Sequence, residues 1–122
     1  MPSHRIDRLN SDMQRELSSL IKQLKDPRID DFLSVMRVEV TSDLSHAKVY
    51  IGSINGVERA TEACAVLRHA AGHLRTELSR RLHIRKAPEL SFIPDGSAEY
   101  YEKITSILEK YPHEQSDGAQ ED

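Results

Sequence analysis

The sequence predicts a single α+β domain, a two-layer sandwich in which a three-stranded sheet carries its helices on one face. Three observations lead to this prediction. Apolar residues recur every three to four positions over residues 4–25 and again over 57–82, which is the period of an amphipathic helix. Apolar and polar residues alternate over residues 36–51, which is the period of a half-buried strand. A chain of 122 residues can build one such core but not two.

The first expected helix spans residues 4–25. Its apolar side consists of Ile6, Leu9, Met13, Leu17, Leu20, Ile21 and Leu24. The basic residues on the opposite side are Arg8, Arg15 and Lys22, with Arg5 nearby. That basic row is compatible with an ordinary solvated helix face and with part of a surface for an anionic partner. Asp26-Pro27 ends the helix, because the residue before a proline is disfavoured in the α region.

Two strands are expected next, joined as an antiparallel hairpin. The apolar positions of the alternating pattern are Met36, Val38 and Val40 before the turn and Ala47, Val49 and Ile51 after it. The turn is supplied by residues 42–45, Ser-Asp-Leu-Ser. Asn55-Gly56 then breaks the chain before the next helix, which is expected to begin near Val57.

The segment from Val66 to Asp95 is the most informative part of the chain. It begins as a helix, and Gly72 in its interior costs about 1 kcal/mol relative to alanine. We therefore expect Gly72 to separate one helix from a second, basic helix. Pro88 ends the helical pattern, and Glu89–Ile93 is expected to form the third strand. From Arg68 to Lys86, six basic residues accompany one acid, Glu77: Arg68, Arg75, Arg80, Arg81, Arg85 and Lys86.

This basic, glycine-interrupted segment has two interpretations. A basic helical element that is interrupted at a glycine and leads into a sheet can hold a phosphate backbone. The alternative is a solvated surface helix that tolerates a glycine. The segment alone does not decide between them.

The end of the chain differs from its body in charge. Pro94-Asp95-Gly96 predicts a turn, residues 98–111 predict a last amphipathic helix, and residues 112–122 predict an acidic, disordered tail. Residues 99–122 hold seven acids and two bases, whereas residues 1–98 hold 15 bases and 13 acids. The net charge of −3 therefore conceals a mildly basic body behind an acidic end.

The sequence contains no convincing catalytic or metal-binding motif. The sequence has no nucleophile elbow, no phosphate-binding glycine loop and no CxxC pair. His69, His73 and Glu77 are spaced by four, but the glutamate of an HExxH motif is missing and Gly72 loosens the helix between them. We expect no enzyme activity, no metal and no cofactor. Cys64, the single cysteine, lies on an apolar helix side and is expected to be a buried hydrophobe.

No segment resembles a signal peptide or a membrane span, so we expect a soluble, cytoplasmic protein without a membrane partner.

A basic helix junction beside a three-stranded sheet is the architecture of a KH domain. Ordinary KH domains clamp the nucleic-acid backbone with GxxG, and this chain has Ala70-Ala71-Gly72 at the junction instead.

The whole pattern, over about residues 4–110, resembles the ribosome-binding factor A family. The segments that carry the resemblance are Arg5-Ile6-x-Arg8, Glu16-Leu17-Ser18, Asp26-Pro27-Arg28, Val40-Thr41, Asp43-Leu44-Ser45, Ala47-Lys48-Val49-Tyr50, Leu74-Arg75, Leu82, Arg85, Pro88-Glu89-Leu90, Phe92 and Asp95. The resemblance implies a KH-like fold of type II topology over residues 1–111, with an Ala-x-Gly kink between two helices.

The resemblance further implies a bacterial assembly factor that binds 16S rRNA and the free or immature 30S subunit. Late maturation, including that of the rRNA 5′ end, and growth in the cold are the implied roles. We expect a monomer that does not bind DNA. The runner-up is a protein-interaction module whose acidic end binds a basic partner such as a ribosomal protein.

The expected RNA-binding residues fall into three groups. Phosphate contacts are expected from Arg68, Arg75, Arg80, Arg81, Arg85 and Lys86. Close approach of the RNA backbone at the kink is expected at Ala70, Ala71 and Gly72. An extension of this footprint is expected at Arg5, Arg8 and Arg15.

Overall fold

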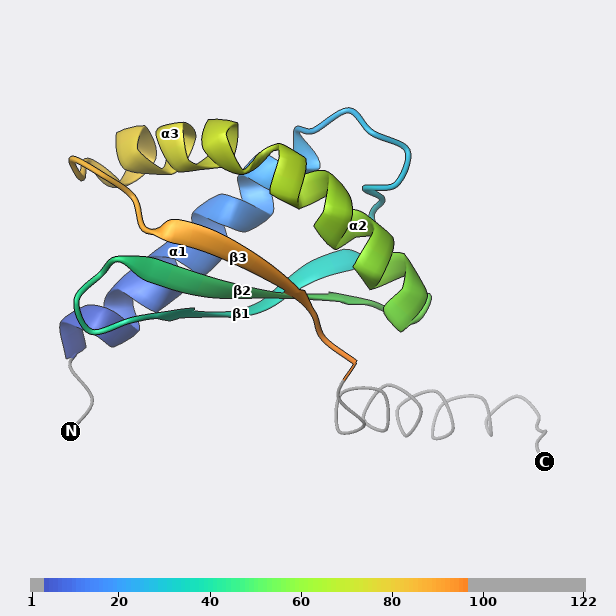
Figure 1. Ribbon diagram of the computed structural model, residues 1–122, viewed down its shortest axis with the longest axis horizontal. Helices are drawn as coiled ribbons and strands as arrows, with labels where there is room; N and C mark the ends of the chain where they lie inside the picture. The colour runs from blue at the N-terminus through green and yellow to red at the C-terminus, as the bar shows by residue number, and fades with distance from the viewer. Residues whose placement is uncertain (1–3, 97–122) are drawn as a thin grey trace, which may run out of the picture.

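The computed structural model describes residues 4–96, and the helix expected over 98–111 and the tail expected over 112–122 lie outside them. The elements are α1 (His4–Lys22), β1 (Leu33–Val40), β2 (His46–Ser53), α2 (Val57–His69), α3 (Ala71–Leu82) and β3 (Glu89–Pro94). The three strands form one sheet, and α1, α2 and α3 lie on the same face of it (Figure 1). The α+β sandwich and the order of its elements up to β3 are confirmed.

The central strand of the sheet is β2. It pairs antiparallel with β1 and parallel with β3, and the crossover between the two parallel strands is made by α2 and α3. Val49 and Ile51 of β2 and Phe92 of β3 point from the sheet toward the helices and are buried. Among the exposed side chains on the opposite side of the sheet are Arg37 and Lys48.

The long helix α1 joins the sandwich through both apolar and polar side chains. Met13 and Leu17 are fully buried against the sheet. Asn10 accepts a 2.9 Å hydrogen bond from the backbone N–H of Val40 through its side-chain oxygen, and so holds α1 against β1. The helix ends at Lys22, three residues before the expected end, because Gln23 donates to the carbonyl of Leu20 in a tighter i→i−3 turn.

Strand β1 departs from the simple alternation expected from the sequence. It begins at Leu33 rather than at Met36, and a β-bulge interrupts its pairing with β2 between Val35 and Arg37. The extra residue at the bulge reverses the inward and outward positions that precede it. Val35 is therefore buried together with Val38, whereas the sequence pattern placed Met36 on that side.

The break between α2 and α3 falls at Ala70, so the expectation that Gly72 separates the two helices is wrong. Ala70 has φ −93° and ψ 4°, and it is both the C-cap residue of α2 and the N-cap residue of α3. Gly72 is the second residue of α3, has no positive φ, and has no atom within 4 Å of the position a Cβ would take. The junction between the two helices is therefore at Ala70, the first residue of the Ala-x-Gly segment. Gly72 lies in the first turn of α3, where it adds no side chain to the surface.

Cys64 lies on α2 and is completely buried, as expected. Burial raises the pKa of its thiol to about 11, although the nearby charge of Arg68 opposes the shift. A thiol with this pKa is not ionised at neutral pH, which fits a packing role. None of the helices within residues 4–96 is long and apolar enough to cross a membrane.

Candidate nucleic-acid interface

The chain that follows α3 turns back along the same helix. His83 ends α3 in the left-handed conformation with φ 57°, and the N–H of Ile84 donates to the carbonyl of Ser79 at 3.0 Å. A left-handed residue after a helix reverses the chain in this way. The reversal brings Arg85 and Lys86 back beside the first turns of α3.

Two side chains of α3 hold this returning segment through Ala87. The Oγ of Ser79 accepts a 2.8 Å hydrogen bond from the N–H of Ala87, and the Nη2 of Arg75 donates a 3.0 Å hydrogen bond to its carbonyl oxygen. The Nε of Arg75 is buried and has no hydrogen-bond partner among the described residues. The guanidinium is thus held in place through a backbone carbonyl, and within residues 4–96 no acid forms an ion pair with it.

Arg75 lines two open hollows. One, of about 260 Å³, is lined by Gly72, Arg75, Thr76, Ser79, Arg85, Lys86 and Ala87. The other, of about 370 Å³, is lined by Leu44, Ser45, Arg75, Lys86, Ala87 and Glu89. Arg85 and Lys86 are exposed and form no ion pair among residues 4–96. The two hollows therefore make a groove with three positive charges, none of which is ion-paired within the described part of the chain.

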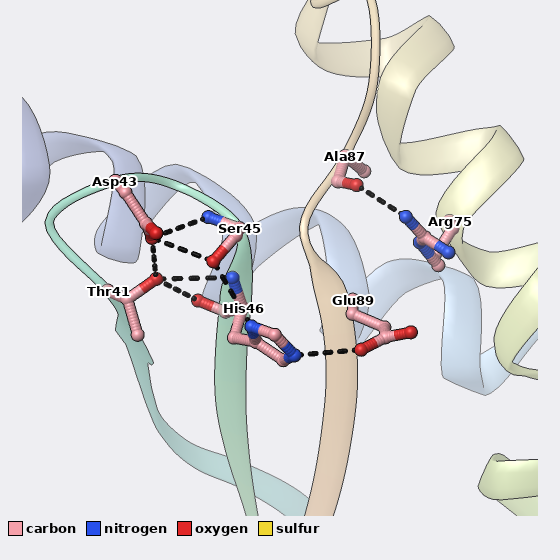
Figure 2. A network of polar contacts seen from close by, with 7 residues as sticks. All are labelled: Thr41, Asp43, Ser45, His46, Arg75, Ala87 and Glu89. Carbon is pink, nitrogen blue, oxygen red and sulfur yellow. Dashed lines mark hydrogen bonds and ion pairs between the residues drawn. The ribbon is translucent and has the colours of Figure 1, made fainter.

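The hairpin between β1 and β2 forms the far wall of this groove, and its tip is fixed by Asp43. The Asp43 carboxylate accepts hydrogen bonds from the hydroxyls of Ser45 and Thr41, each at 2.7 Å, and from the N–H of Ser45 at 3.1 Å (Figure 2). These donors lower the pKa of Asp43 from 3.8 to about 2, the Ser45 hydroxyl having the largest effect. Hydrogen bonds among Thr41, Asp43 and Ser45 therefore stabilise the turn, and Leu44 is exposed at its tip.

Leu44 at this tip has an unusual backbone. Its φ is 63°, in the left-handed region that a bulky residue rarely adopts, and the residue is 42% exposed. Beside Leu44 lies a third hollow of about 280 Å³, lined by Arg5, Ile6, Leu9, Ser42 and Leu44. Leu44 lines both this hollow and the 370 Å³ hollow, so the two hollows meet at the hairpin tip.

The structure separates the twelve predicted site residues into several environments. Gly72, Arg75, Arg85 and Lys86 line the groove, and Arg5 lines the separate 280 Å³ hollow. Arg8 is exposed on α1, and Ala70 and Ala71 lie half-buried at the helix junction. Arg68 lies on α2, where its Nη2 donates to the carbonyl of Phe92 at 2.9 Å.

The remaining three predicted residues form ion pairs with acids. Arg80 pairs with Glu77 at 3.0 Å. Glu16 of α1 lies between two cations, 3.3 Å from Arg81 of α3 and 4.0 Å from Arg15 of its own helix. These pairs neutralise much of the charge that the sequence pattern assigned to residues 80 and 81, and the Glu16–Arg81 pair joins two helices.

Sequence reasoning missed Leu44, Ser79 and Glu89 as parts of this groove. The sequence predicts a turn at Asp43-Leu44-Ser45, but the left-handed conformation of Leu44 has no signal in its residue type. Ser79 and Glu89 are polar residues near basic ones in the chain, and only the reversal after His83 brings them to the groove.

Within residues 4–96 no three histidine, cysteine or acidic side chains lie close enough together to hold a metal ion.

Comparisons with known proteins agree with this fold. The family model described as "Ribosome-binding factor A" matches residues 5–108. A ribosome-binding factor A from Caldanaerobacter subterraneus subsp. tengcongensis is 38% identical over 115 residues, which cover 93% of this chain and 94% of that protein. One from Heliobacterium modesticaldum is 44% identical over 110 residues, which cover 88% and 89% respectively.

Solved structures show the same similarity. The crystal structure of ribosome-binding factor A from Thermus thermophilus aligns with a TM-score of 0.64 and 31% identity, covering 73% of this chain and 94% of that one. A homology model of the Thermus thermophilus factor, fitted into a cryo-EM map of its complex with the 30S subunit, aligns with a TM-score of 0.60 and 32% identity. It covers 70% of this chain and 90% of that one.

Proposed function

This chain belongs to the ribosome-binding factor A family, and we propose that it binds the small ribosomal subunit during assembly, with 16S rRNA as its ligand. The observation that carries the proposal is the groove beside α3. Arg75, Arg85 and Lys86 present charge there without ion-pair partners among residues 4–96, and Gly72 offers no side chain that would keep a backbone away. The relative fitted into the 30S map has the same fold as this chain.

The groove suits RNA that is recognised mainly through its backbone. Phosphate contacts supply affinity that depends on salt, because each contact releases condensed counterions. An RRM stacks bases on the aromatic residues of its strands. Tyr50 of β2 is instead covered by Arg37, whose guanidinium carbon lies 4.2 Å from the ring centroid. The arrangement supports recognition of a folded rRNA surface by cations and not by stacked bases.

The role of such binding is assistance in late maturation of the subunit. We propose that the protein acts as a monomer on immature 30S particles, supports processing of the 16S rRNA 5′ end, and supports growth in the cold, when RNA rearranges slowly. It acts by binding and performs no bond-breaking step itself. A strain without the protein should accumulate, at low temperature, small subunits whose 16S rRNA keeps an unprocessed 5′ end.

Co-sedimentation of the full-length protein with immature and mature small subunits tests the binding itself. We expect saturable binding to immature particles, with an affinity that falls steeply as salt rises. Binding that is lost when the chain is cut after Tyr111 would favour the rival function, in which the acidic end binds a basic ribosomal protein. Equal binding to immature and mature particles would contradict a role confined to assembly.

A further inference from the structure

Glu89 is an acid that lines a basic groove, and phosphate binding alone gives no reason for it. It lines the 370 Å³ hollow together with Arg75 and Lys86, the two cations to which we assign phosphate contacts. A carboxylate at this place repels an RNA backbone. Its presence therefore points to a ligand group that needs an acceptor.

The structural role of Glu89 is small. Its Oε1 lies 2.8 Å from Nε2 of His46 on the neighbouring strand (Figure 2), but the two side chains are 65% and 55% exposed. Exposed pairs of this kind contribute little to stability. The parallel pairing of β3 with β2 positions Glu89 independently of its side chain, because its N–H donates to the carbonyl of Ser45 at 2.9 Å.

The surroundings of Glu89 have the composition of a nucleotide site. The hollow has a volume of about 370 Å³ and is open to solvent. Leu44 supplies an apolar wall at one side, and its left-handed φ of 63° is maintained by the bonds of the Asp43 turn. Strained backbone that the surrounding structure maintains is concentrated at functional sites. Lys86 and Arg75 add two cations to the lining of the hollow.

We propose that this hollow is a nucleotide subsite in which Glu89 selects guanine. The proposal rests on the RNA-binding function proposed above and extends it to base recognition. A carboxylate only accepts hydrogen bonds, and its two oxygens offer about four lone-pair positions, of which His46 occupies one. Guanine presents two adjacent donors on its Watson–Crick edge, N1–H and N2–H, which match the two oxygens. Uracil and adenine place an acceptor beside their donor and meet repulsion at the same position.

The remaining groups complete the fit. Leu44 packs against the face of the unstacked base, and Lys86 and Arg75 bind the adjoining phosphates. Single-stranded RNA presents bases in this way, whereas a base inside a duplex keeps its Watson–Crick edge paired. The subsite therefore takes one unpaired guanosine of an otherwise unspecifically bound strand.

The test uses the full-length protein and short uridine RNAs that carry one central guanosine, adenosine or cytidine, with fluorescence anisotropy at low salt. We expect the wild-type protein to bind the guanosine RNA about tenfold more tightly than the all-uridine RNA, the size of discrimination given by a bidentate base contact. In Glu89→Gln, the amide replaces one acceptor oxygen by a donor, so the preference for guanosine should fall to within about twofold. Affinity for the all-uridine RNA should not fall, because a repelling charge has been removed from the groove.

Two further variants separate base recognition from structure. His46→Ala removes the partner of Glu89 and should keep the guanosine preference. Leu44→Ala should weaken binding of all the RNAs by a few-fold, as expected when an apolar contact to a base face is lost. An unchanged preference in Glu89→Gln, or a wild-type protein that binds all the RNAs equally, would overturn the subsite and leave the proposed RNA binding intact. Failure to bind any RNA, with binding to immature subunits retained and directed to a ribosomal protein, would overturn both.

Discussion

The guanidinium of Arg75 donates a 3.0 Å hydrogen bond from Nη2 to the carbonyl oxygen of Ala87, and this bond ties α3 to the segment that leads into β3. Ala87 is only 3% exposed, so water has little access to replace the donor. The same side chain lines both hollows of the groove. Arg75 therefore combines a structural bond with a charge that faces the groove.

Replacement of Arg75 by Met should lower both stability and RNA affinity. The methionine keeps an apolar stem but leaves the carbonyl of Ala87 without its donor, which costs about 1–3 kcal/mol of unfolding free energy. Arg85→Met is the matched control, because Arg85 is exposed and forms no ion pair within the described part of the chain, so its stability should change by less than about 0.5 kcal/mol. Urea unfolding measures the stability of both variants. Equal stability of the two variants would show that the Ala87 bond contributes nothing.

The paired cations Arg81 and Arg80 should differ in their effect on folding. Arg81 is 30% exposed and connects α3 to Glu16 of α1, so Arg81→Ala should lose up to about 1 kcal/mol of unfolding free energy. Arg80 is 71% exposed and pairs with Glu77 of its own helix, so Arg80→Ala should stay within about 0.5 kcal/mol. Thermal unfolding of both variants measures this difference. A more stable Arg81→Ala protein would argue against a structural pair between the two helices.

Gly72 should tolerate alanine in the folded state, whereas a bulkier residue there should disturb the complex. It is helical and a Cβ would meet open space, so Gly72→Ala should stabilise the protein by up to about 1 kcal/mol through helix propensity. Gly72→Val should weaken binding to immature subunits if RNA approaches the bare turn. Gly56→Ala is the contrast, because φ at Gly56 is 111° and alanine there should cost about 1–3 kcal/mol. Normal binding by Gly72→Val would remove this turn from the interface.

The turn that holds Leu44 should loosen in acid. The pKa of Asp43 is lowered from 3.8 to about 2 in the folded protein, so its contribution is present above about pH 4 and is lost as the pH falls toward about 2. The amide signals of Leu44 and Ser45 in an NMR titration should follow that transition. In Asp43→Ala the transition should be absent. A midpoint near 3.8 in the wild-type protein would show that the hydroxyl and N–H donors do not favour the carboxylate.

Most of the fold was predictable from the sequence, because the helical and strand periodicities are strong and because Pro27, Gly56 and Pro88 lie in segments between elements. The bulge in β1 was not predictable, since Val35 and Met36 are both apolar and nothing in their order says which one faces the core. The position of the helix break at Ala70 was missed for a related reason. Alanine is a strong helix former, so its role as a junction follows from packing and not from local preference.

The candidate site was predictable only in part. The sequence identified the basic residues of 68–86 but could not tell which of them meet an acid, because Glu16 is distant in the chain from Arg81. It also could not place Glu89 and Leu44 in one groove, since that requires the reversal after His83 and the pairing of β3 with β2. Charge content is local information, whereas compensation of charge depends on tertiary contacts.

The most direct measurement of the central claim is the salt dependence of binding to immature small subunits for two variants of equal charge change. Lys86→Ala removes a groove cation that has no ion pair within residues 4–96, and Lys48→Ala removes an exposed lysine from the opposite side of the sheet. We expect Lys86→Ala to weaken binding and to reduce the magnitude of the logarithmic salt slope by about 1, while Lys48→Ala leaves both unchanged. An unchanged slope in Lys86→Ala together with a reduced slope in Lys48→Ala would contradict the groove as the RNA-binding surface and place the contact on the other face of the sheet.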